Sequence, residues 1–152
     1  MDFVGAKVAL FCGDRVLTCL RDDHPGLPWQ GMWDLPGGGR EGDETPEACL
    51  LRELDEEFGL RLPPERLIWR RVWPSIMDAG RASVFFAGYI SDDEIAAIRF
   101  GSEGQGWEMM ALPGFLDHSL GIPEMQRRVR VALAEIRGQE NLEARFFVNS
   151  LL

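Results

Sequence analysis

The feature that most constrains this chain of 152 residues is a short acidic segment, residues 52–57, with four acids in five consecutive positions. On a helix turning about 100° per residue, the apolar side chains of residues 50–58 share one arc and predict a core-facing stripe. Glu53, Glu56 and Glu57 fall in the adjacent arc at spacings i, i+3 and i+4, so their carboxylates can converge. Such a helix is either a solvated charged face or a site for a hard divalent cation, Mg²⁺ or Mn²⁺. Glu57 borders the apolar arc, so we expect it to be the most desolvated of the three acids.

Length and composition predict one globular domain, with 45% hydrophobic and 27% charged residues. The formal charge of −9 argues against DNA, RNA or an anionic membrane as a partner, but allows a small anion whose approach metal ions screen. Cys12, Cys19 and Cys49 lack metal-binding spacing and predict free thiols in a reducing, cytoplasmic setting. We identify neither a signal peptide nor a membrane-spanning run.

Alternating strand and helix patterns predict an α/β fold, a sandwich around a mixed sheet. Strands are expected at residues 4–11, 15–20, 67–73, 83–90 and 107–112. Thr45 is placed to cap a helix that Pro46 begins and Gly59 ends. A short helix opens at residues 91–94 and an amphipathic one covers about 122–137, whereas residues 22–40 and 101–106 have loop composition and the tail 139–152 has no clear pattern.

The residues around the acidic segment carry a more specific pattern. Gly38, Glu44, Arg52 to Leu54, Glu56 to Glu57 and Gly59 to Leu60 occupy every specified position of the Nudix box, G-x5-E-x7-R-E-U-x-E-E-x-G-U with U aliphatic. The approach Trp-Asp-Leu-Pro-Gly-Gly also resembles the entry common in this superfamily. The chain thus resembles a MutT-like Nudix hydrolase. That resemblance implies one Nudix-type α/β/α sandwich over residues 1–152, with the box at 38–60.

The resemblance also implies roles for individual residues. Glu53, Glu56 and Glu57 would bind the metal together with the backbone carbonyl of Gly37. Arg52 and Glu44 would orient the acids, and Gly38 and Gly59 would serve backbone geometry. Glu103 lies in a glycine-flanked loop that resembles one supplying a further acid and metal ligand; the alternative is a turn residue facing water. Glu53 and Glu103 are the two candidates for general base.

Substrate contacts are less constrained. Arg21, Arg40 and Arg81 are candidates for binding phosphate, Arg21 because MutT-like members often place such an arginine after the second strand. Trp29 and Trp33 are able to stack on a base or to plug the fold, and we assign Trp33 to packing. The asparagine with which oxidised-guanine-selective enzymes read the base is missing near the start of the last helix; Gln126 is the one substitute, which places an 8-oxo-dGTP preference in doubt.

The implied function is metal-dependent hydrolysis of a phosphoanhydride bond in a nucleoside diphosphate linked to X, with NTPs or dNTPs favoured. The alternatives are an NDP-sugar or ADP-ribose hydrolase, a non-catalytic nucleotide-binding module, and an isomerase on the same scaffold. The isomerase would need a pocket cysteine, and the non-catalytic module predicts a damaged box, whereas this box is intact. We expect a small nucleotide partner and a monomer or homodimer, the apolar tail being a candidate interface.

Overall fold

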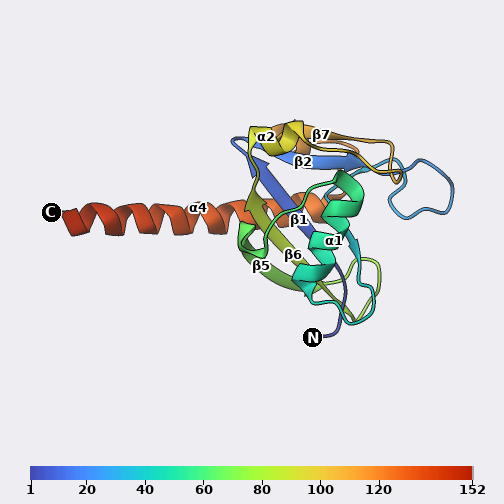
Figure 1. Cartoon of the computed structure of the whole chain (residues 1–152), viewed down its shortest axis with the longest axis horizontal. Coiled ribbons are helices and arrows are strands. Elements are labelled where there is room, and N and C mark those ends of the chain that lie inside the picture. Colours follow the sequence, from blue (N-terminus) through green and yellow to red (C-terminus); the bar gives the residue numbers. More distant parts are fainter. Residues whose placement is uncertain (152) are drawn as a thin grey trace.

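The computed structural model describes residues 1–151. Seven strands in these residues form one mixed sheet with the order β3-β2-β1-β6-β5, to which β4 adds beside β1 and β7 beside β2 (Figure 1). The strands are β1 (Phe3–Cys12), β2 (Arg15–Leu20), β3 (Trp33–Asp34), β4 (Gly37–Gly39), β5 (Leu67–Pro74), β6 (Ala82–Tyr89) and β7 (Gly106–Ala111). The β1–β6 pair is parallel, and the other strand pairs are antiparallel.

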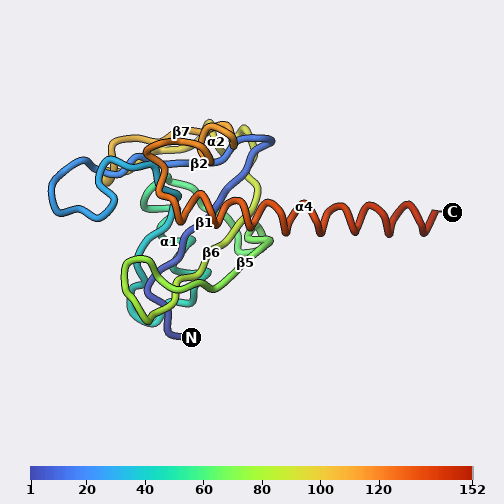
Figure 2. The backbone as a smooth tube through the Cα atoms, turned by 180° about the vertical axis from the view of Figure 1, so that it is seen from behind, coloured from blue at the N-terminus to red at the C-terminus, as the bar shows by residue number. Residues whose placement is uncertain are grey.

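Two helices cover opposite faces of this sheet. Side chains alternate along a strand, so Ala6, Val8 and Leu10 of β1 join one core cluster and Ala9 and Phe11 join the other. Helix α1 (Pro46–Phe58) packs in the first cluster and helix α4 (Pro123–Leu151) in the second. In Figure 1 α1 lies in front of the sheet, and in Figure 2, from behind, α4 does. The predicted α/β/α sandwich is confirmed.

The expected limits of the acidic helix are also confirmed. The Thr45 hydroxyl accepts a hydrogen bond from the amide of Ala48, and Pro46 is the first helical residue. Gly59 ends α1 in the left-handed conformation, with φ +64°, where a side chain is disfavoured. The helix is therefore fixed at both ends by its own sequence.

A fork between β1 and β2 creates the space for the site. The two strands pair only near their shared turn, at Phe11 with Val16 and Cys12 with Arg15. Farther along, β1 pairs with β4, whereas β2 pairs with β3 and β7. The free ends of β1 and β2 consequently diverge, and α1 lies against β1 and β4 beside this opening (Figure 1).

Several short elements escaped prediction. The expected loop 22–40 contains β3 and β4, which are two and three residues long and too short to show a periodic pattern. The strand expected at 107–112 ends one residue earlier, because α3 (Leu112–Leu116) begins there. A 3-10 turn, η1 (Pro64–Arg66), precedes β5, and α2 (Asp92–Ala96) is the expected short helix, with Ser91 and Glu94 forming a capping box.

The prediction that the last helix ends at about residue 137 was wrong. Helix α4 continues through Gly138 to Leu151, because one glycine lowers helix stability without ending a helix, and good helix formers follow it. Its buried residues lie between Met125 and Ile136, and the rest projects from the domain as a single exposed helix (Figure 1). None of the helices in residues 1–151 combines the length and apolar character that a membrane-spanning helix needs.

Candidate active site

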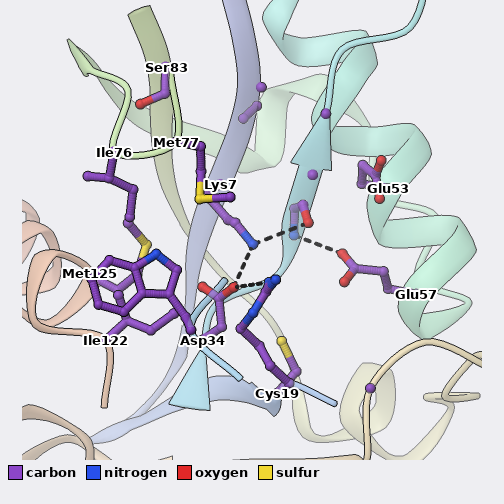
Figure 3. Close-up of a pocket in the computed structure, with 18 of the residues that line it drawn as sticks. Lys7, Cys19, Asp34, Glu53, Glu57, Ile76, Met77, Ser83, Ile122 and Met125 are labelled. Carbon is purple, nitrogen blue, oxygen red and sulfur yellow. Dashed lines mark hydrogen bonds and ion pairs between the residues drawn. The ribbon is translucent and has the colours of Figure 1, made fainter. Parts of the chain in front are cut away.

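A cavity of about 700 Å³ opens at the fork between β1 and β2. Its walls come from the diverging ends of these strands, the glycines of β4, the acidic side of α1, the start of α4, and loops around residues 21–29, 75–78 and 103–104. Figure 3 shows Glu53 and Glu57 reaching from α1 toward β4, with Lys7 and Asp34 beside them. Segments distant in the sequence thus meet around one concave surface.

Two carboxylates of α1 line the cavity. Glu57 accepts a hydrogen bond of 2.8 Å from the amide of Gly37, and burial raises the pKa of its carboxyl to about 7. Burial also raises the pKa of Glu53. The expectation that Glu57 is the most desolvated of the acids is confirmed, and both groups are held where a positive charge would stabilise their ionised forms.

Arg52 connects the acids of the box. Its Nε donates to both carboxylate oxygens of Glu44 at 3.2 and 3.0 Å, and Nη1 donates to Glu53 at 3.0 Å and Glu56 at 3.1 Å. The hydrogen bonds from Arg52 lower the pKa of Glu44. Glu56 is 57% exposed and lies outside the cavity lining. The structure therefore places Arg52 and Glu44 where they can fix the side chain of Glu53.

Two glycines allow the close approach of β4 to its neighbours. A Cβ at Gly38 would lie 2.5 Å from the carboxyl carbon of Glu53. Gly37 has φ +132°, and a Cβ there would lie 2.1 Å from the carbonyl oxygen of Ala6. Any larger residue at either position would displace its neighbour.

Lys7 lines the cavity, although no sequence pattern predicted a role for it. Its Nζ donates to the carboxylate of Asp34 at 2.9 Å and to the carbonyls of Leu35 at 3.1 Å and Gly37 at 3.4 Å. Burial alone would lower the pKa of Lys7, but the negative charge of Asp34 and its neighbours raises it overall. One feature of the sequence could have indicated this role: Lys7 is the only lysine of the chain and lies in an otherwise apolar strand.

The oxygen atoms at this end of the cavity fit a hard divalent cation. Glu53 and Glu57 supply carboxylates, Gly37 supplies a backbone carbonyl, and Glu103 also lines the cavity. Mg²⁺ and Mn²⁺ prefer such oxygen ligands. Within residues 1–151 no three His, Cys, Asp or Glu side chains already converge as a metal cluster. Water and substrate oxygens would complete the shell of a cation bound by these groups.

The three candidate arginines are placed differently. Arg21 lines the cavity, where its guanidinium donates to Asp34 at 3.2 Å and to the carbonyl of Pro28 at 2.9 Å. Arg40 covers the ring of Phe3, and Arg81 pairs with Asp2 and Asp78. Neither Arg40 nor Arg81 lines the cavity, so the structure brings only Arg21 to the other site residues.

Gln126 does not reach the cavity. Its amide nitrogen donates to the carbonyls of Phe115 and His118, both at 2.9 Å, and holds the turn between α3 and α4. Trp33 packs against the second core cluster, as assigned. Trp29, in contrast, is 37% exposed and lines the cavity.

The α/β/α sandwich with the acidic helix α1 packed against the glycine-rich strand β4 is the arrangement that the Nudix resemblance predicts. The sequence model of the NUDIX domain matches residues 2–125, and the chain belongs to this family.

Two relatives match this chain over short stretches. The chain is 45% identical over 56 residues to an RNA pyrophosphohydrolase of Acidiphilium cryptum, covering 37% of this chain and 33% of that protein. It is 60% identical over 30 residues to an 8-oxo-dGTP diphosphatase of Proteus vulgaris, covering 20% of this chain and 27% of that protein. The matches thus span about a third of these relatives or less.

A solved structure shares the fold more widely. A bifunctional NMN adenylyltransferase/ADP ribose pyrophosphatase from Francisella tularensis, in complex with AMP and a manganese ion, superposes with a TM-score of 0.70. The superposition covers 89% of this chain and 42% of that one at 21% identity. At this identity the similarity establishes the fold.

Proposed function

We propose that this protein is a metal-dependent hydrolase that cleaves a phosphoanhydride bond in a nucleoside diphosphate linked to a second group, with NTPs and dNTPs preferred. The observation that carries the proposal is the pair of half-buried carboxylates, Glu53 and Glu57, facing the cavity beside the carbonyl of Gly37. Such a pair is unfavourable alone and favourable around a cation. The names of the relatives, which are pyrophosphohydrolases and diphosphatases, support the same reaction.

Each residue of the site is assigned a role in this proposal. Glu53, Glu57 and the Gly37 carbonyl at the cavity would hold Mg²⁺ or Mn²⁺, and Glu56, which Arg52 holds beside Glu53 outside the lining, would add a further ligand. Arg52 with Glu44 would fix Glu53. Bound cations supply charge neutralisation on the diphosphate and a more acidic water. Arg21 would bind a phosphate oxygen at the cavity wall. Glu53 or Glu103, both at the cavity, would accept the proton of the attacking water.

Hydrolysis of ADP-ribose or an NDP-sugar is the second candidate. The Francisella protein of similar fold is described as an ADP ribose pyrophosphatase, and a volume of about 700 Å³ is within the usual range for such ligands. An RNA end is less favourable, because the net charge of −9 repels a polyanion.

The free cysteines are consistent with a cytoplasmic site of action.

The test is hydrolysis of a substrate panel with Mg²⁺ or Mn²⁺: NTPs, dNTPs including 8-oxo-dGTP, ADP-ribose, NDP-sugars and a 5′-triphosphorylated RNA. Release of phosphate, pyrophosphate or nucleoside monophosphate is measured for wild type, Glu53→Gln and Asp55→Asn. Asp55 is the matched control, because it lies on the same helix but is half-exposed and pairs with Arg61 away from the cavity.

We expect metal-dependent turnover by wild type and Asp55→Asn, and a large loss for Glu53→Gln. Equal turnover by all three proteins would contradict the assignment of the acidic side of α1 as the active site. Tight nucleotide binding without turnover of any substrate would favour the non-catalytic module instead.

A further inference from the structure

The cavity has an apolar end opposite its acidic end. Figure 3 shows Ile76, Met77, Ile122 and Met125 on the side away from Glu53 and Glu57, with Lys7 and Asp34 between the two groups. Ile76 and Met77 belong to the β5–β6 loop and are 39% and 58% exposed. Two apolar side chains exposed in a short loop at the rim of a cavity are available to cover a flat apolar ligand group.

The polar side chains near this end are already engaged within the protein. Arg128, only 2% exposed, donates to Glu124, to Ser83 and to the carbonyl of Pro74. Ser75 accepts from the amides of its own loop, and Asp78 pairs with Arg81. Gln126 lies outside the cavity. Among the residues described, this end therefore has little side-chain capacity to read the hydrogen-bonding edge of a base.

Trp29 is the large aromatic side chain in the cavity wall, and its backbone is strained. It has φ +55°, which is the only positive φ outside glycine within residues 1–151. A bulky residue in this conformation costs free energy and persists only where its surroundings enforce it. A glycine would satisfy the same turn without that cost, so the indole ring itself is the feature that needs an explanation.

The loop of Trp29 is fixed to the site by direct contacts. Arg21, which lines the cavity, donates from Nε to the carbonyl of Pro28 at 2.9 Å. The carbonyl of Trp29 accepts from the amide of Met32 at 3.2 Å, and the amide of Gly31 donates to the backbone carbonyl of Asp22 at 3.0 Å. The ring is thus held on a short turn tied to the same arginine that would contact phosphate.

We propose that Trp29 binds the nucleotide by stacking on its planar base, with Ile76 and Met77 covering the base from the β5–β6 loop. This inference rests on the proposed function and adds a prediction about selectivity. Recognition by stacking and apolar contact accepts any base, favouring purines because their rings are larger. Substrates that differ only in base should therefore be hydrolysed with similar kcat, and KM should follow ring size.

Substitutions at Trp29 distinguish the contribution of its ring to substrate binding from the effect of its strained backbone on stability. Trp29→Gly removes the ring and relieves the positive φ, so we expect a thermal midpoint no lower than that of Trp29→Ala. With ATP we expect an increase in KM of about 5- to 100-fold at little change in kcat, a smaller increase with CTP, and recovery in Trp29→Phe. Trp33→Phe is the matched control, because Trp33 packs in the core, and its KM should stay near wild type.

A binding measurement keeps this inference separate from the hydrolase proposal. AMP is titrated in chelator, following intrinsic fluorescence, and inorganic pyrophosphate is tested as a competitor of ATP with Mg²⁺. We expect AMP to quench wild type and Trp33→Phe but not Trp29→Phe, and Trp29→Gly to leave pyrophosphate inhibition unchanged. Stacking is overturned if wild type shows no AMP-dependent change, if Trp29→Gly keeps the wild-type KM, or if it weakens AMP and pyrophosphate equally. If no substrate is hydrolysed but AMP quenches through Trp29, the hydrolase proposal fails and the stacking site stands.

Discussion

The two ends of the cavity are built in different ways. The acidic end belongs to α1 and β4, where Arg52 ties Glu44, Glu53 and Glu56 together and glycines allow close packing. The apolar end is lined by Ile76, Met77, Ile122 and Met125, of which the two from the β5–β6 loop are partly exposed, and the partly exposed ring of Trp29 lines the same cavity. One end has fixed charges suited to chemistry, and the other has adaptable surface suited to binding. Changes at the acidic end should therefore lower kcat, whereas changes at the apolar end should raise KM.

The largest effect is expected for Glu53→Gln. Removing the charge takes away a proposed metal ligand and candidate base, so kcat should fall by about 10²- to 10⁴-fold. Because the amide has the same shape as the carboxyl group, the thermal midpoint should stay close to wild type. Steady-state kinetics with saturating Mg²⁺ measures the loss, and wild-type kcat in this variant would remove Glu53 from the mechanism.

The second effect concerns stability in the absence of metal. Burial raises the pKa of Glu57 from its ordinary 4.5 to about 7, so the folded protein keeps this proton to higher pH than the unfolded chain. Stability is therefore lost as pH rises from about 4.5 to about 7. In chelator, Glu57→Gln should match wild type near pH 4.5 and exceed it near pH 8 by up to about 3 kcal/mol. Denaturant unfolding at several pH values gives this difference, and a pH-independent difference would contradict it.

The third prediction compares adjacent glycines. In Gly38→Ala the new Cβ would lie 2.5 Å from the carboxyl carbon of Glu53, whereas in Gly39→Ala the nearest heavy atom, the carbonyl oxygen of Val4, lies 3.9 Å away. The flexible end of Glu53 can move aside, so Gly38→Ala should fold, yet lose about 10- to 100-fold in kcat. Gly39→Ala should remain near wild type in kcat. Equal kinetics for the two variants would show that the position of Glu53 is not critical.

The smallest effect is expected at the apolar end. Met77 is 58% exposed, so Met77→Ala should change the free energy of unfolding by less than about 0.5 kcal/mol. Losing its cover over the base should raise KM for ATP by about 2- to 10-fold without changing kcat. A fall in kcat instead would place Met77 at the acidic end of the cavity.

The layers of the fold and the limits of α1 were predictable from sequence, because they depend on local patterns. Alternation in β1 and β6 and the capping residues Thr45 and Gly59 are properties of short segments. The end of α4 was not predictable, because a single Gly138 is compatible with either outcome. The strands β3 and β4 depend on pairing with distant partners, which no local pattern reports.

The same distinction between local sequence patterns and contacts with distant segments applies to the candidate site. Helix periodicity fixes the directions of Glu53 and Glu57, which line the cavity, and of Arg52, which donates to Glu53. Lys7 and Trp29 lie outside any motif, and their roles depend on contacts between strands and loops far apart in the sequence. Arg40 and Arg81 show the converse, as suitable residues that the fold directs to Glu44, Asp2 and Asp78 instead.

The most direct test is steady-state hydrolysis of ATP with Mg²⁺ by wild type, Glu53→Gln and Trp29→Gly in parallel. We expect metal-dependent turnover by wild type, a loss confined mainly to kcat in Glu53→Gln, and an increase confined mainly to KM in Trp29→Gly. If both variants instead changed the same parameter by the same factor, the division of the cavity into a chemical end and a binding end would be wrong.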